Sequence, residues 1–315
     1  MAKIDLSQVK QAHYIKLGEG GAWERLCLED GTIRIGFYEV PPAMAVNRDV
    51  EGIRQTYLNL GKTDGTATRF AGELLKFYEA GPETLWITFS GGKLYWAIAT
   101  GTPEYLGADK VDFPQGSALR QTVSGWQSAT LSGAPLHTKD LSGRLTKVAG
   151  YRGTICTLET WEFDYLVRRL QDQEPKEVTQ AKEARCQILG TCEALIKLLP
   201  WADFELLVDL VFTQSGWRRI GSLGGTQKTA DIELIQPMTG ERAIVQVKST
   251  TSAAELAEYE AAFSGMSADR YFYVWHTCKG KLTPTLPNLT MIGPEMMAEH
   301  VLNAGLFDWL VQKNS

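Results

Sequence analysis

The most constraining feature of the sequence is a pair of apolar segments separated by a turn, with polar residues at fixed positions around them. Asp231 opens the first segment, residues 232–235, and a Pro-Met-Thr-Gly turn follows at residues 237–240. The second segment alternates up to Gln246 and Lys248, so the pattern predicts a β-hairpin. Side chains two residues apart on a strand share a face, which places Gln246 and Lys248 together. The hairpin therefore gathers a carboxylate, an amide and an ammonium group.

This set of side chains is suited to the hydrolysis of a phosphodiester bond. Hydrolysis adds negative charge to oxygens that already carry it, so a divalent cation and a lysine both stabilise the transition state. Mg²⁺ (or Mn²⁺) prefers oxygen ligands and keeps several waters, so one or two protein side chains can hold it. We expect Asp231 and Gln246 to bind the metal. We expect Lys248 to orient or deprotonate the attacking water, or to neutralise the phosphate.

A second acidic residue is predicted upstream. Apolar residues at positions 204, 207, 208 and 211 recur at helical spacing, and Glu205 lies on a neighbouring face of that helix. Glu205 is therefore the fourth predicted catalytic residue, beside Asp231, Gln246 and Lys248.

The order of these predicted elements resembles the PD-(D/E)xK nuclease superfamily. A helix carries Glu205, two strands carry Asp231 and the Gln-x-Lys pair, and a helix at residues 252–263 precedes a strand at residues 271–275. The phrases FELLVDLVFTQSGW and VQVK, with a glycine pair between them, are most similar to the Mrr branch, which also carries Gln where most relatives carry Glu. The resemblance covers roughly residues 185–312. It implies an α/β domain with an αβββαβ core, a mixed sheet and Mg²⁺-dependent endonuclease activity.

One part of the sequence departs from that branch. Its members usually carry a Gly-Asp-Gly-Gly-Ile-Asp-like run, whereas here residues 226–230 separate Gly224 and Gly225 from Asp231. Because of this departure, the geometry of the loop and the metal affinity of the site need not match those of the Mrr branch.

Length and composition favour two domains. With 315 residues, of which 44% are hydrophobic, the chain can bury a sizeable core. The polar segment at residues 171–184 is the predicted linker between domains at residues 1–170 and 185–315.

No apolar run approaches the roughly 20 residues that span a bilayer, and the first residues, MAKIDLSQVK, lack the apolar region of a signal peptide. Five scattered cysteines form no CxxC pair, so we expect a cytoplasmic protein.

Charge suggests a local contact with nucleic acid. The formal net charge of −5 argues against a basic coat over the whole surface. Residues 116–153, however, hold five basic residues and one acidic residue. We expect this segment to follow the DNA backbone; the alternative is an ordinary solvated loop face. The predicted backbone contacts are Lys139, Arg144, Lys147 and Arg152.

The N-terminal region is predicted to be β-rich, with a hairpin at residues 85–99 and a helix at residues 68–79. Its many aromatic residues are mostly expected in the core. Trp23 and Trp126 differ, because each follows a glycine-containing turn, and a loop tryptophan can stack on a base turned out of a duplex. The phrases LWITF and LYWAIA and this architecture resemble PUA-like barrel domains that recognise modified bases (EVE, YTH and SRA domains). The resemblance implies that Trp23 and Trp126 sandwich the base, while Glu24 or Ser124 bonds to its edge.

These features together favour a modification-dependent DNA endonuclease, similar to type IV restriction enzymes that act in phage defence. The N-terminal domain would recognise a modified cytosine flipped out of double-stranded DNA, and the C-terminal domain would cut nearby. Cutting both strands needs two active sites, so we expect a homodimer, at least on DNA. Two alternatives stay open. The neutral Gln246 is compatible with a non-catalytic DNA-binding module on a nuclease fold, and PUA-like domains also bind RNA, which allows an RNA-directed nuclease.

Overall fold

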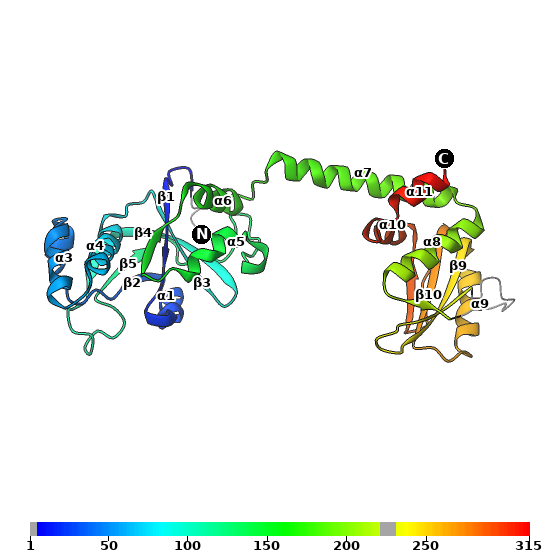
Figure 1. Cartoon of the computed structure of the whole chain (residues 1–315), viewed down its shortest axis with the longest axis horizontal. Coiled ribbons are helices and arrows are strands. Elements are labelled where there is room, and N and C mark those ends of the chain that lie inside the picture. Colours follow the sequence, from blue (N-terminus) through cyan, green and yellow to red (C-terminus); the bar gives the residue numbers. More distant parts are fainter. Residues whose placement is uncertain (1–4, 221–230) are drawn as a thin grey trace. The chain divides into compact units, whose positions relative to one another are not determined.

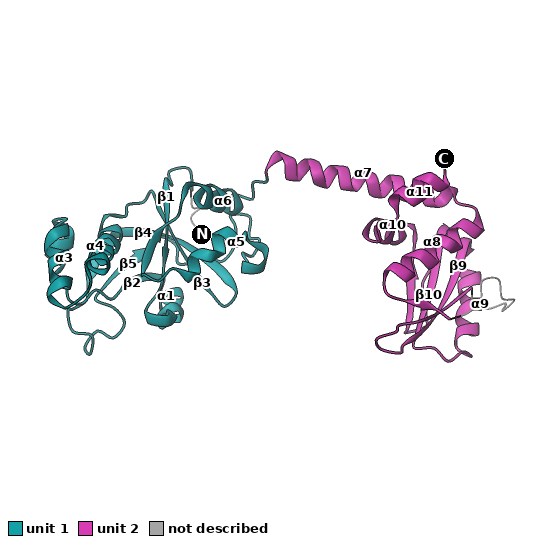
Figure 2. Ribbon diagram, viewed as in Figure 1, with its two compact units in different colours: residues 1–174 teal, residues 175–315 magenta. Residues whose placement is uncertain are grey.

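A computed structural model of the chain describes residues 5–220 and 231–315 and contains two separately packed units (Figures 1 and 2). Unit 1 comprises residues 1–174 and unit 2 comprises residues 175–315. Gly224 and Gly225, whose loop is relevant to the nuclease resemblance, lie outside the described residues. The boundary falls inside the predicted linker, but α7 (Lys176–Leu198) already begins there. The polar residues of this segment are mostly good helix formers, so most of the expected linker is helical.

Unit 1 contains a six-stranded mixed sheet in the order β2-β5-β4-β3-β1-β6. The parallel ladder joins β1 and β3, and the other ladders are antiparallel. The predicted hairpin is confirmed as β3 and β4, which pair from Leu85↔Ile98 to Ser90↔Lys93 around Gly91 and Gly92, both at positive φ. No ladder joins the outer strands β2 and β6 among residues 5–220, so barrel closure is not part of the described sheet. The strands are β1 (Gln11–Ile15), β2 (Thr32–Ile35), β3 (Thr84–Ser90), β4 (Lys93–Tyr105), β5 (Ala118–Thr122) and β6 (Ile155–Thr157).

Helices cover both faces of this sheet. On one face α1 to α4 pack around the buried Trp86, and on the other α5 and α6 pack over Leu85 and Ile87. The helix predicted at residues 68–79 is longer than expected, because Thr63 caps its start by accepting a hydrogen bond from the Thr66 amide. The helices are α1 (Glu24–Asp30), α2 (Pro42–Val46), α3 (Val50–Asn59), α4 (Asp64–Glu79), α5 (Gly143–Thr146) and α6 (Thr160–Leu170), with 3₁₀ turns η1 (Glu19–Gly21), η2 (Thr138–Asp140) and η3 (Lys147–Gly150).

Unit 2 contains a five-stranded mixed sheet in the order β11-β10-β9-β8-β7. Strands β7 to β9 are antiparallel, whereas β10 and β11 run parallel to β9. The elements α8-β7-β8-β9-α9-β10 follow the αβββαβ order expected from the sequence. Their bounds are α8 (Trp201–Gln214), β7 (Arg218–Arg219), β8 (Ile232–Ile235), β9 (Arg242–Ser252), α9 (Ala253–Phe263), β10 (Arg270–Lys279), β11 (Leu289–Ile292), α10 (Pro294–Asn303) and α11 (Phe307–Lys313).

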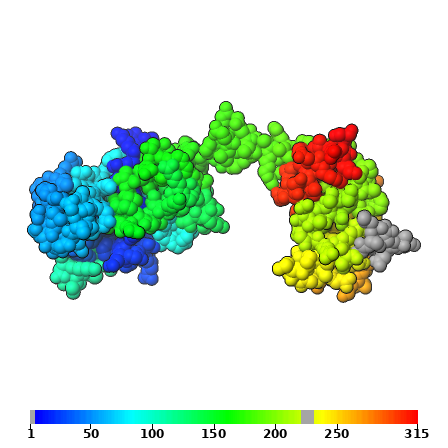
Figure 3. Space-filling view, viewed as in Figure 1, coloured from blue at the N-terminus to red at the C-terminus, as the bar shows by residue number. Residues whose placement is uncertain are grey.

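The alternation along β8 and β9 assigns each side chain to one face of the sheet. Val245 and Val247 belong to the core that includes α8, α10 and α11, whereas Ile244 belongs to the core under α9. Gln246 and Lys248 therefore share the α9 face, as the hairpin pattern predicts. The side chains at the C-terminal end of α11 lie at the surface of unit 2 (red in Figure 3).

No helix in residues 5–220 or 231–315 is long and apolar enough to cross a membrane.

A buried histidine makes the stability of unit 1 depend on pH. His13 on β1 is 3% exposed, its ring meets Trp86 edge to face at 5.2 Å, and its Nδ1 has no hydrogen-bond partner among the described residues. Burial, with a smaller effect of Lys76, lowers the pKa of His13 from 6.5 to about 4. Between about pH 4 and pH 6.5, His13 therefore binds a proton in the unfolded chain but not in the folded chain. The free energy of unfolding thus falls as pH falls through this range.

We predict that His13→Leu weakens this acid destabilisation. The thermal midpoint of the variant should drop less than that of the wild type when pH is lowered from 6.5 to about 4. His137→Leu, which removes a half-buried histidine elsewhere in unit 1, is the matched control and should keep the wild-type pH dependence. Equal pH dependence of His13→Leu and wild type would rule out His13 as the source.

Candidate active site

Asp231 lies where β8 and β9 part. The ladder between the strands ends at Ile232↔Val245, and the Asp231 amide donates to the Val245 carbonyl at 3.1 Å. The Asp231 carboxylate then accepts from the Val247 amide at 2.7 Å and from the Gln246 side-chain amide. Burial raises the pKa of Asp231, although the Val247 amide and the charge of Lys248 act in the opposite direction. The hairpin thus fixes a half-buried carboxylate at the end of the ladder.

Gln246 presents an oxygen that lacks a partner. Its side chain is buried, at 3% exposed, and its Nε2 donates to Asp231. Its Oε1 has no hydrogen-bond partner among the described residues. A buried polar oxygen without a partner is costly, and an amide oxygen beside a carboxylate is a typical ligand for a hard cation. The residues present therefore fit a divalent cation held by Asp231 and Gln246.

Lys248 lies on the same face and is held by an aromatic ring. Its Nζ lies 4.8 Å from the centroid of the Tyr259 ring on α9. Attraction between an ammonium group and the face of a tyrosine ring restrains the long lysine side chain. The charge of Lys248 also contributes to the electrostatic environment of Asp231. Tyr259 was missed in the sequence because it lies in a different element, and its helical position alone indicates only packing.

Glu205 approaches Asp231 from α8. Its side chain is 17% exposed, and its pKa is raised first by burial and then by the charge of Asp231. Arg219 on β7 pairs with it, with 3.7 Å between Nη2 and Oε1. The same guanidinium lies 3.5 Å from the Asp209 carboxylate and donates to the Asp231 carbonyl at 3.2 Å. All four predicted catalytic residues therefore gather at one end of the β8–β9 ladder.

Sequence reasoning missed Arg219 and Asp209. Asp209 follows Glu205 by four residues, a spacing that places both carboxylates on the same face of α8. That spacing could have indicated an acidic pair. The partnership with Arg219 could not be predicted, because it depends on how β7 packs against α8.

The two candidate metal ligands come from different segments of the hairpin: Asp231 immediately precedes β8, and Gln246 lies on β9. Residues 5–220 and 231–315 contain no group of three or more His, Cys, Asp or Glu side chains placed to hold a metal. The oxygen donors are instead one carboxylate and one amide, with Glu205 engaged by Arg219. Few protein ligands and several waters are typical of Mg²⁺ sites, and such an ion would act as a Lewis acid for a phosphate oxygen.

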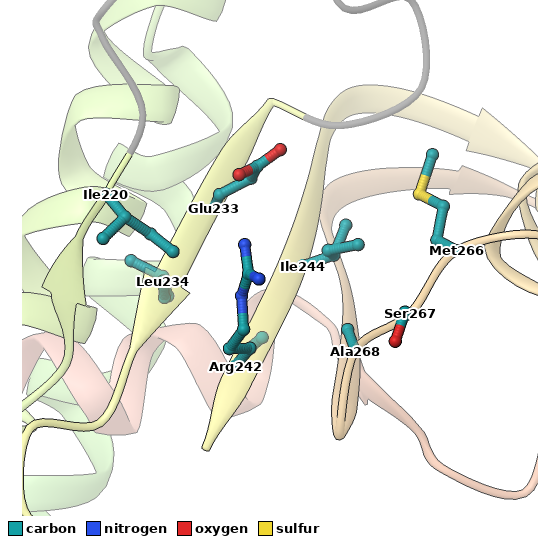
Figure 4. Close-up of a pocket in the computed structure, with 9 residues that line it drawn as sticks. Ile220, Glu233, Leu234, Arg242, Ile244, Met266, Ser267 and Ala268 are labelled. Carbon is teal, nitrogen blue, oxygen red and sulfur yellow. The ribbon is translucent and has the colours of Figure 1, made fainter. Parts of the chain in front are cut away.

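A small pocket lies on the α9 face of the sheet, and its lining includes none of the predicted catalytic residues (Figure 4). Its volume is about 230 Å³, and Glu233, Arg242 and Ile244 from β8 and β9 line one side of it. Residues 266–268, which follow α9, line the other side. Ile244 shares its face with Gln246 and Lys248, so the pocket lies on the side of β9 that carries these two residues.

His276 does not join the site. Its strand neighbour Trp275 is in register with Lys248, so His276 points to the opposite face. There its ring meets Phe204 at 4.8 Å, and burial lowers its pKa. It packs as part of the α8 side of the sheet.

The predicted base sandwich in unit 1 is not formed. Trp126 is 9% exposed, belongs to the hydrophobic core and donates from its indole to the Thr32 carbonyl at 2.9 Å. It follows a glycine turn, as expected, but it packs inward because this turn returns the chain to the core. Burial leaves little of the Trp126 surface for a base, so the structure does not support the prediction that Trp126 stacks on one.

Trp23 and Glu24 lie together at the start of α1. Trp23 is half-buried and donates to the Pro114 carbonyl at 3.1 Å. Its ring packs on glycine backbone, since a Cβ atom at Gly18 or Gly36 would come within 2.8 or 2.9 Å of it. Glu24 lines a shallow pocket of about 480 Å³ with residues of α1 and Ser90. Ser124 is half-buried in another loop, where its carbonyl accepts from Gln127 at 2.8 Å.

The predicted basic surface is smaller than the sequence suggests. Arg144, whose side chain is 51% exposed, pairs with Glu162 at 2.6 Å and with Glu159 at 3.1 Å, so two carboxylates offset its charge at the surface of unit 1. Arg120, counted in the same segment, is buried and donates to two backbone carbonyls. The remaining basic residues are exposed and have no ion pair among the described residues; they are Lys139, Lys147 and Arg152.

We predict that Asp231→Asn abolishes the stabilisation of the chain by Mg²⁺. The amide keeps the size of the side chain and can still accept from Val247, but it loses the anionic ligand. A ligand at a hundredfold excess over its Kd stabilises the folded state by about 2.7 kcal/mol, so the wild-type thermal midpoint should rise with added Mg²⁺. The midpoint of Asp231→Asn should not change.

Glu233→Gln is the matched control, because it removes one carboxylate from β8, two residues after Asp231. It should keep the wild-type response to Mg²⁺. If Asp231→Asn responded as strongly as the wild type, Asp231 would not be a metal ligand.

Comparison with protein-family models, with curated proteins and with solved structures finds no match for this chain. The functional assignment therefore depends on the geometry of its own residues.

Proposed function

We propose that this chain is a Mg²⁺-dependent endodeoxyribonuclease, in which unit 2 hydrolyses a phosphodiester bond and unit 1 recognises a modified base. One observation carries the proposal. The Asp231 carboxylate accepts a hydrogen bond from Gln246, whose Oε1 has no partner among the described residues, and the charge of Lys248 acts on the same carboxylate. An anionic ligand, a neutral oxygen ligand and a cation are the groups that phosphodiester hydrolysis needs.

Each residue has a distinct role in this proposal. Asp231 and the Gln246 Oε1 hold the divalent cation, and Glu205 supplies a further acidic group from α8. The cation, when bound, polarises the phosphate and lowers the pKa of a bound water. Lys248 holds the attacking water or neutralises the phosphate, and Tyr259 limits the positions that its side chain can adopt.

The arrangement of unit 2 supports a nuclease of the PD-(D/E)xK type. The chain carries the αβββαβ order, an aspartate at the start of the second strand and Gln-x-Lys on the third. The glutamine at this position supports the Mrr-like branch in particular. Such a site contacts the DNA backbone, which carries no sequence information directly, so selectivity needs a second element.

Unit 1 is the proposed source of selectivity. Its candidate base-contacting residues are Trp23 and Glu24, which are adjacent in the chain, and Glu24 lines the shallow pocket at α1. Its candidate backbone contacts are Lys139, Lys147 and Arg152. We propose that unit 1 binds a modified cytosine in double-stranded DNA, and that two copies of the chain act together because each strand needs its own active site.

Lys248→Ala tests the chemistry of the site. Removal of the ammonium group should lower the rate of Mg²⁺-dependent DNA cleavage by about two orders of magnitude or more, because one stabilising group of the transition state is lost. DNA binding, measured with a labelled duplex in the absence of cutting, should remain. Lys281→Ala, on an exposed loop of the same unit, is the control and should cut like the wild type. Full activity of Lys248→Ala would refute the assigned role of Lys248.

Matched duplexes test the recognition step. The wild-type chain is incubated with Mg²⁺ and duplexes that differ only in carrying cytosine, 5-methylcytosine, 5-hydroxymethylcytosine or N6-methyladenine. We expect selective cutting of a duplex with a modified cytosine, and Trp23→Ala should remove this selectivity. Equal cutting of all duplexes would exclude recognition by unit 1. Absence of cutting would favour the DNA-binding module, and preference for structured RNA over every duplex would favour an RNA-directed nuclease.

A further inference from the structure

Arg219 is a partly buried cation placed among the acidic residues of the candidate site. Its side chain is 14% exposed, and Glu205 and Asp209 flank it from one face of α8. The closest distances, 3.7 Å to Glu205 and 3.5 Å to Asp209, show a guanidinium shared between two carboxylates rather than bound tightly to one. Its Nη2 also donates to the Asp231 carbonyl, so Arg219 touches the backbone of the predicted metal ligand.

We propose that Arg219 is a built-in counter-ion that competes with the divalent cation for Glu205. When the metal binds, Asp209 attracts the Arg219 guanidinium away from Glu205. This inference rests on the proposed metal-dependent function and concerns how that site is regulated. Without metal, the guanidinium reduces the repulsion between Glu205 and the Asp231 carboxylate. With metal, Glu205 turns to the new cation, and Arg219 remains paired with Asp209.

Loss of the Arg219 charge and loss of the Asp209 charge have opposite effects on metal affinity. The carboxylates of Glu205 and Asp209 flank Arg219, and the charges of Arg219 and Lys248 both act on the Asp231 carboxylate. A cation repels an incoming divalent ion, so loss of the Arg219 charge tightens metal binding. Loss of the Asp209 charge leaves Arg219 with Glu205 as its one carboxylate partner among those described, which weakens metal binding.

A purely structural role would give a different result. If Arg219 served only to clamp β7 against α8, then removal of either Arg219 or Asp209 would loosen the site. Both changes would then weaken metal binding, and both would lower the thermal midpoint without metal. The direction of the change in affinity therefore separates the two roles.

The test is a calorimetric titration of the full chain with Mn²⁺, without DNA, so the readout is independent of cleavage. Arg219→Gln should lower the Kd of Mn²⁺ by roughly tenfold, and Asp209→Asn should raise it by roughly threefold to tenfold, as expected for charges a few ångströms away in a partly buried site. Arg219→Lys, which keeps the charge, should stay close to the wild type.

Arg218→Gln is the matched control, because it removes the same charge from the neighbouring, exposed position of β7. Its Kd should change less than twofold, since an exposed charge is screened. Weaker Mn²⁺ binding by both Arg219→Gln and Asp209→Asn would overturn the counter-ion role and leave the proposed function in place. No Mn²⁺ binding by the wild-type chain would overturn the proposed function, and this inference with it.

Discussion

The hydrogen bond from the Val247 amide to the Asp231 carboxylate is the interaction on which the candidate site depends. It continues the β8–β9 pairing beyond the last backbone ladder pair, with a side chain in place of a carbonyl. The same carboxylate also accepts from Gln246, which turns the amide so that its oxygen is left without a partner. One local constraint thus orients two candidate ligands at once, and the strand alternation adds Lys248 on the same face. The site is a consequence of how this hairpin ends.

The carboxylates of this site are unfavourable for the unliganded fold. Burial raises the pKa of both Asp231 and Glu205, which means that each resists ionisation more than an exposed acid does. Arg219 and Lys248 reduce that cost, but their pairing distances are long or their partner is a ring. Buried groups kept in an unfavourable charge state are typical of functional sites, where a ligand or metal provides the missing interaction. The counter-ion role of Arg219 follows from the same balance of charges.

Local patterns predicted much of unit 2 and less of unit 1. The hairpin around Asp231 and the αβββαβ order follow from alternation and helical spacing, which act over a few residues. The start of α7 was missed because helix formers within a polar segment resemble a linker. The inward packing of Trp126 and the ion pairs of Arg144 could not be predicted, because a loop tryptophan or a loop arginine has the same local sequence whether it faces solvent or a partner distant in the chain. Their burial and ion pairs are decided by tertiary packing.

The most direct test of the central claim is the position of a divalent cation in crystals of the wild-type chain grown with Mn²⁺. The anomalous scattering of manganese locates the ion independently of any assumption about its ligands. The account predicts a peak within coordination distance of the Asp231 carboxylate and the Gln246 Oε1, with the Glu205 carboxylate turned toward it and waters completing the shell. A peak elsewhere in the chain, or no peak at this site at millimolar Mn²⁺, would contradict it.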